Sequence, residues 1–65
     1  LAWVRRSFET LPEKQRTALQ LRDIDGHSYQ EVATAMDISE SDVKVTLHRA
    51  RQALKEKLSH LRFHL

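Results

Sequence analysis

The basic side chains of residues 43–55 are the groups best suited to chemistry in this sequence. This stretch contains no acid and four basic residues, Lys44, Arg49, Arg51 and Lys55. Residues 1–39 hold five Lys or Arg against six acids, whereas residues 40–65 hold six against three. Because ammonium and guanidinium groups bind phosphates and base edges, a basic stretch without acids predicts a polyanionic partner. A solvated helix face would show the same pattern. The helices that carry these residues must therefore distinguish a binding surface from a solvated face.

A single small all-α domain is the predicted frame for this stretch. A chain of 65 residues forms one core at most. With one glycine, one proline and few alternating apolar residues, helices are favoured over strands. The absence of cysteine excludes disulfides and thiolate metal sites. We find no apolar run suited to a membrane span or a secretory signal, and we expect a soluble, cytoplasmic protein without a membrane partner. Because the chain begins at Leu1 rather than Met, we also expect it to be a fragment of a longer protein.

The first two of four predicted helices lie before Gly26. Apolar residues recur at helical spacing at the start of the chain (Leu1, Val4, Phe8) and predict one short helix. The run Thr10–Glu13 offers a capping hydroxyl, a first-turn proline and a glutamate, and predicts the start of a second helix. This helix is expected to end at Gly26, which tolerates a left-handed conformation. Its apolar residues are Ala18, Leu19, Leu21 and Ile24.

Ser28 and Ser39 predict the starts of the other two helices. Ser28 and Glu31 have the spacing of a capping box, and Ser39 and Asp42 form a weaker version of it. The fourth helix is the longest, with one apolar face made of Val43, Leu47, Ala50, Leu54, Leu58 and Leu61. The connection at 36–39 is too short for antiparallel packing, so a helix-turn-helix is predicted over about residues 28–58. Asp37 is expected at a positive φ, and Ile38 is expected to fill the corner.

The far side of the fourth helix is the predicted reading face. Steps of 100° per residue from Val43 bring six residues to this side: Ser41, Lys44, Val45, His48, Arg49 and Gln52. The major groove of DNA admits one helix, whose side chains read the base edges. Lys44 and Arg49 suit guanine or phosphate, and His48 suits a base edge or phosphate. Val45 suits a thymine methyl group.

Contacts to phosphates are predicted around the reading face. Arg51 and Lys55 flank it and are expected to bind the DNA backbone. Ser39 and Ser41 lie beside the free amides that begin the fourth helix, although the Ser39 hydroxyl also suits capping. Ser28 and Tyr29 begin the supporting helix, which crosses the DNA backbone in such motifs, and Tyr29 is equally suited to the core.

Three motifs together resemble region 4 of the bacterial sigma-70 family, particularly the extracytoplasmic-function sigma factors. They are LPEKQR at 11–16, DGHSYQEVA at 25–33 and VKVTLHRARQAL at 43–54. The resemblance covers roughly residues 8–58 in the same order and spacing. It implies a four-helix domain, winged-helix-like but without a wing, that occupies residues 1–65. It also implies that the residues at the positions of Lys44, Val45, His48 and Arg49 approach DNA.

The resemblance further implies a role in transcription initiation. Its last helix would read the promoter −35 element of double-stranded DNA while the domain is tethered to core RNA polymerase through the β-subunit flap. An anti-sigma factor is a common further partner. The sequence departs from the family at Val45 and Thr46, where many relatives carry serine and arginine, and this leaves the preferred −35 sequence undetermined.

Other classes of function remain as alternatives. The output domains of response regulators and other repressors share the short supporting helix and the turn, although LHRARQAL favours the sigma family. A sigma-like bundle that binds an acidic protein is a third hypothesis. Neither an enzyme nor a bound cofactor is expected, because no serine has histidine and carboxylate partners in a suggestive arrangement. His60 and His64 have the spacing of metal ligands but lack a third ligand, so no metal is expected.

Overall fold

The computed structural model describes the backbone of residues 2–62 and the side chains of residues 2–59. These residues form α1 (Ala2–Glu9), α2 (Glu13–Leu19), the π-helical turn η1 (Gln20–Ile24), α3 (Tyr29–Met36) and α4 (Glu40–Arg62), with no strand among them. The predicted all-α, four-helix class is therefore confirmed. The contributions expected of Leu1, Leu61, His60 and His64 lie outside the described side chains.

The connection between α1 and α2 differs from the prediction. The Thr10 hydroxyl does not cap α2; it donates to the Ser7 carbonyl at 2.7 Å and so closes the end of α1. The residue before α2 is Pro12, which makes no side-chain cap. Instead, its carbonyl accepts the Arg16 amide at 2.9 Å. A proline can precede a helix in this way because its missing N–H has no intrahelical partner to lose.

The last turn of the second predicted helix is wider than an α-helix. At the end of η1 the Asp25 amide donates to the Gln20 carbonyl at 2.9 Å, five residues back, and Gly26 follows with φ 81° and stops the helix. The predicted end at Gly26 is confirmed. Ile24, which we expected on the apolar side, is 63% exposed. A π turn carries more residues than an α turn, so it shifts the side chains beyond it out of the α-helical phase.

The helix-turn-helix forms as predicted. The Ser28 hydroxyl accepts the Glu31 amide at 3.1 Å, and the Glu31 carboxylate accepts the Ser28 amide at 2.8 Å, which is a complete capping box. Asp37 ends α3 at φ 56°. The Ile38 amide then donates to the Ala33 carbonyl at 3.0 Å, so the turn is a Schellman motif.

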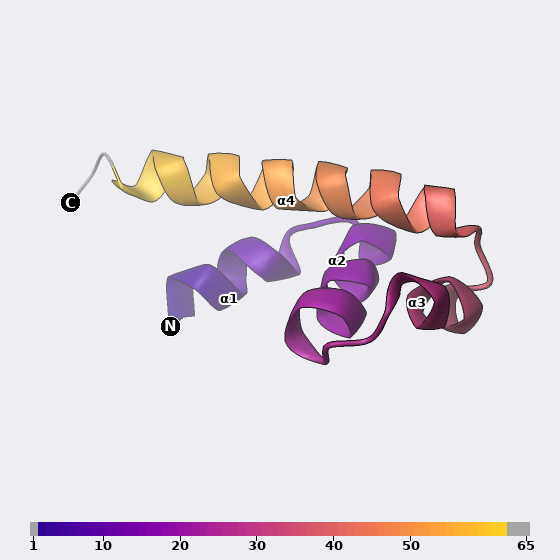
Figure 1. The fold of residues 1–65 in the computed structure, drawn as a ribbon. Helices are drawn as coiled ribbons and strands as arrows, with labels where there is room; N and C mark the ends of the chain where they lie inside the picture. Colours follow the sequence, from indigo (N-terminus) through magenta and orange to yellow (C-terminus); the bar gives the residue numbers. More distant parts are fainter. Residues whose placement is uncertain (1, 63–65) are drawn as a thin grey trace.

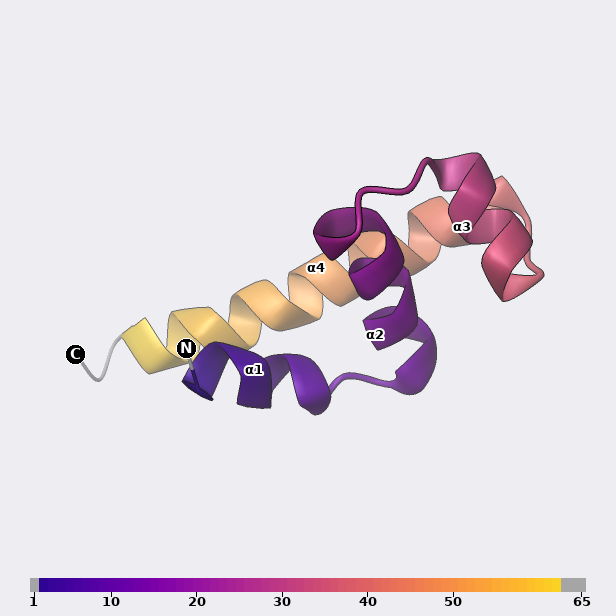
Figure 2. The same ribbon diagram turned by 90° about the horizontal axis from the view of Figure 1, so that it is seen from below.

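The core lies where α2, α3 and α4 meet. Its buried apolar residues are Leu11, Ala18, Leu19, Val32, Ala33, Val43, Leu47 and Ala50. Figure 1 shows α4 running along the whole molecule, with α3 near its first turns and α1 beside its later ones. The view from below agrees with this arrangement (Figure 2). The first half of α4 therefore packs on α2 and α3, and the second half packs on α1. None of the described helices is long and apolar enough to cross a membrane.

Candidate nucleic-acid interface

The first half of α4 has a buried side and an exposed side. Val43, Leu47 and Ala50 are at most 1% exposed and face the core. The side chains predicted for the reading face are all exposed: Ser41, Lys44, Val45, His48, Arg49 and Gln52. The predicted phase of this helix is therefore confirmed, and a surface of cationic and polar side chains lies opposite the core. We call these six residues the reading face.

The position of Thr46 changes how we interpret residues 45 and 46, where the sequence departs from the serine and arginine of many relatives. Its side chain is only 5% exposed, and its hydroxyl donates to Asp42 at 3.1 Å. Thr46 is thus a buried, hydrogen-bonded residue on the inner edge of α4 rather than part of the reading face. Val45 is 46% exposed. Only Val45, a residue without hydrogen-bonding side-chain atoms, therefore leaves the base preference open.

The start of α4 is fixed to the start of α2 by an ion pair. Lys14 Nζ donates to both carboxylate oxygens of Asp42, at 3.0 and 3.1 Å, and this bond lowers the pKa of Asp42. The Ser39 hydroxyl accepts the Asp42 amide at 3.0 Å and caps the helix. Because the hydroxyl proton is not used in that bond, Ser39 keeps a donor for a phosphate. The ion pair also offsets an acidic charge close to the reading face.

Tyr29 lies close to two cations. Its half-buried ring has the Arg22 guanidinium carbon 4.6 Å and the Lys44 Nζ 5.6 Å from its centroid. The Arg22 Nη1 also donates to the His27 carbonyl at 2.8 Å. Ser28, the other residue predicted here, is exposed and forms the cap of α3. Tyr29 therefore packs against the core and contacts the reading face at the same time.

The two cations predicted to flank the reading face differ in their surroundings. Arg51 is held by Asp23, with Nη2–Oδ1 and Nε–Oδ2 distances of 2.7 and 3.0 Å. The hydrogen bond from Arg51 lowers the pKa of Asp23, and the same bond raises the pKa of Arg51. Lys55 is exposed one turn later. Arg51 is thus tied to η1, and its contact with phosphate stays a prediction.

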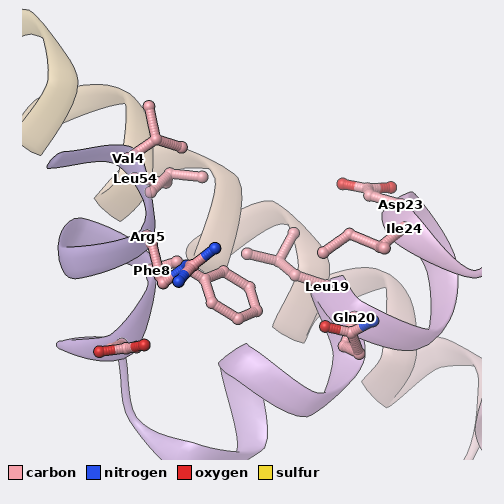
Figure 3. A pocket seen from close by; sticks show the side chains of 9 residues that line it. Val4, Arg5, Phe8, Leu19, Gln20, Asp23, Ile24 and Leu54 are labelled. Atoms are coloured by element: carbon pink, nitrogen blue, oxygen red, sulfur yellow. The ribbon is translucent and has the colours of Figure 1, made fainter. Parts of the chain in front are cut away.

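An apolar groove lies between α1, η1 and α4. Figure 3 shows Val4 and Phe8 of α1 on one side and Leu19 and Ile24 on the other, with Leu54 of α4 beside them. The groove has a volume of about 510 Å³. Leu54 follows Val43 by eleven residues, so it lies on the same side of α4 as Val43 and away from the reading face. The groove and the reading face are therefore accessible at the same time.

Sequence reasoning missed several of these residues. Lys14 and Asp23 each pair with a residue 28 positions away, and no local pattern predicts such partners. Arg22 and the groove residue Ile24 depend on the π turn, which has no distinct periodic signal. Among the residues that the structure describes, no three potential ligands come together to hold a metal ion.

Comparisons with known proteins agree with this geometry. The family "Sigma-70, region 4" matches residues 1–54. The ECF RNA polymerase sigma-E factor of Escherichia coli K12 is 43% identical over 56 residues, which cover 86% of this chain and 29% of that protein. The RNA polymerase sigma-H factor of Pseudomonas aeruginosa is 40% identical over 60 residues, which cover 92% of this chain and 31% of that protein.

The chain thus spans less than a third of the length of these relatives. The matches favour neither a response-regulator domain nor a repressor, and the family is not one of enzymes. The order of the helices, the helix-turn-helix and the match over residues 1–54 lead to one assignment. The chain belongs to the sigma-70 region 4 family of DNA-binding sigma factor domains.

Proposed function

We propose that this domain reads the −35 element of a promoter by placing α4 in the major groove. The observation that supports this most is the reading face: it is exposed, carries no acid and lies directly opposite the buried stripe of α4. The Asp37 turn orients α4 against α3 as a helix-turn-helix requires. Arg49 and Lys44 then bind base edges or phosphates, His48 and Gln52 add polar contacts, and Val45 meets a thymine methyl group.

Phosphate contacts position the domain on the duplex without specifying sequence. Ser28, Ser39 and Ser41 offer hydroxyl protons near the helix starts, where backbone amides and the helix dipole also favour an anion. Lys55, exposed beyond the reading face, and Arg51, braced by Asp23, extend the positive surface along α4. The role is one of binding, with no catalytic step, cofactor or metal.

The second component of the proposal is attachment to core RNA polymerase through the β-subunit flap. The apolar groove is the surface that supports it, because Ile24 is 63% exposed at its edge and Leu54 lies on the side of α4 away from the reading face. A flap segment bound there would leave α4 free for DNA. Such tethering raises the effective concentration of the domain at the promoter and offsets weak intrinsic DNA binding.

An anti-sigma factor is a further partner under this proposal. It would act by covering the groove, the reading face or both. Covering one surface is enough, because initiation needs both of them. A role in transcription initiation places the protein in the bacterial cytoplasm. The names of the relatives support the role in transcription, since those proteins are RNA polymerase sigma factors.

Selection of bound duplexes from a random pool tests DNA reading. We expect the wild-type chain at low salt to enrich one sequence. Arg49→Gln should lose the enrichment, whereas Arg6→Gln, an equal charge change on exposed α1, should keep it. Enrichment of no sequence by the wild type, in the presence or absence of core polymerase, would refute the proposal.

Leu54→Asp tests the groove: it should weaken binding to core polymerase and leave duplex binding unchanged.

A further inference from the structure

The ring of Tyr29 connects three elements of the domain, η1, α3 and α4. It does so through the cationic side chains of Arg22 and Lys44. Arg22 belongs to η1, Tyr29 is the first residue of α3, and Lys44 is on the reading face of α4. The two cationic groups lie 4.6 and 5.6 Å from the same ring centroid. Both distances are within the range of cation–π attraction. An aromatic ring that was equally suited to the core or to DNA therefore contacts a reading residue directly.

The surroundings of Tyr29 hold its ring in place. The Ser28–Glu31 capping box fixes the backbone on which the ring is carried. The Arg22 guanidinium, anchored on the His27 carbonyl at 2.8 Å, covers the ring from the side of η1. The ring also packs against the buried core. Tyr29 is thus a rigid platform, whereas the Lys44 side chain is exposed and has many rotamers.

We propose that Tyr29 is a positioning residue for DNA reading: its ring holds the Lys44 ammonium group in the orientation in which it meets the duplex. This inference rests on the proposed function, because it assigns a role within −35 recognition. A lysine held before binding loses less side-chain entropy when it binds, and it reaches a smaller set of bases. Tyr29 would therefore contribute to both affinity and discrimination without touching DNA.

A double-mutant cycle tests the proposal. Tyr29→Leu removes the ring, Tyr29→Phe keeps it, and Lys44→Met removes the ammonium group. Affinity is measured for the duplex selected from the random pool and for a scrambled duplex. A cation–π contact at an exposed site corresponds to about a two- to fivefold change in affinity. We expect that loss from Tyr29→Leu, little change from Tyr29→Phe, and no further loss when Tyr29→Leu is added to Lys44→Met.

An equal loss from Tyr29→Leu with and without Lys44 would overturn the proposal, because it would mean that Tyr29 acts on DNA or on the fold directly. A readout without DNA separates these cases from a failure of the proposed function. In the free chain, the Lys44 side-chain methylene protons should show a ring-current shift by NMR in the wild type and in Tyr29→Phe, but not in Tyr29→Leu. The absence of this shift in the wild type would also refute the positioning role, whether or not any duplex binds.

Discussion

The guanidinium group of Arg51 binds both carboxylate oxygens of Asp23, at 2.7 and 3.0 Å. This bidentate pair joins the middle of α4 to the π turn, and the two residues are 28 positions apart. A planar guanidinium meets the two oxygens with N–H groups from two different nitrogens in one plane, whereas a lysine ammonium has only one nitrogen to donate from. The pair therefore fixes the orientation of η1, from which Arg22 reaches Tyr29.

We expect Arg51→Lys to weaken this connection although it keeps the charge. A double-mutant cycle of Arg51→Met and Asp23→Asn, each of which removes one charge of the pair, followed by urea unfolding, should give a coupling of about 0.2–1 kcal/mol, the range of exposed ion pairs. The side chains of Arg51 and Asp23 are 46% and 40% exposed, so a larger value is not expected. Additive losses in the cycle would contradict a direct interaction.

The lowered pKa values of Asp23 and Asp42 predict a loss of stability in acid. Both carboxyl groups bind cations in the folded chain, so their folded pKa lies below the unfolded value of 3.8. Their contribution is complete well above that value and is lost as the pH falls toward the folded pKa. Urea midpoints should therefore fall from about pH 5 downward. Lys14→Met should make this fall shallower, because Lys14 is the main cause of the Asp42 shift; an unchanged slope would contradict the assignment.

The local features of this fold follow from the sequence. The Ser28 cap, the Gly26 stop, the Asp37 turn and the buried phase of Val43 are all determined by residues within one or two helical turns. The exposure of the reading face follows from the same phase, because the position of one side of a helix defines the other. These are the parts of the candidate site that could be predicted.

The remaining features depend on contacts between distant residues. The Thr10 hydroxyl could either cap the next helix or bond back to the previous one, and in the structure it donates to the Ser7 carbonyl and closes α1. The π turn, the Asp23–Arg51 pair and the groove around Ile24 arise when η1 packs against α4 and α1. The spacing of apolar residues does not distinguish a π turn from an α turn, since the two differ by one residue in a short segment.

The two positive-φ residues among those that the structure describes predict the effects of alanine and glycine at these turns. Gly26 has φ 81°, and a Cβ atom there would meet nothing within 4 Å. Gly26→Ala should therefore cost about 1 kcal/mol through backbone conformation alone. Asp37, at φ 56°, already carries a Cβ atom in this conformation, so Asp37→Ala should cost less than Gly26→Ala does. Asp37→Gly should be more stable than Asp37→Ala in urea unfolding, and equal stabilities would contradict the strain at this turn.

Lys55 should behave as a contact to phosphate. It is exposed beyond the reading face, where we expect it to meet the DNA backbone rather than the base edges. We expect Lys55→Ala to weaken binding by a similar factor for selected and scrambled duplexes. The slope of log affinity against log salt should become less steep by about 0.9. A loss confined to the selected duplex would instead assign Lys55 to base reading.

Arg49 should be the main source of base discrimination. It is exposed on the reading face and approaches Asp42 closely enough to lower its pKa, but Lys14 is the principal partner of that carboxylate. The Arg49 guanidinium is therefore available to bind a guanine edge through two hydrogen bonds, a contact of about 1–3 kcal/mol. Titration of the selected duplex should show that loss for Arg49→Ala. Arg49→Lys should recover the nonspecific part of the affinity but not the discrimination, because an ammonium group lacks the planar fork. If Arg49→Lys discriminates between duplexes as well as the wild type does, then Arg49 binds phosphate, and base reading must come from other residues of the reading face, such as Lys44, Val45, His48 or Gln52.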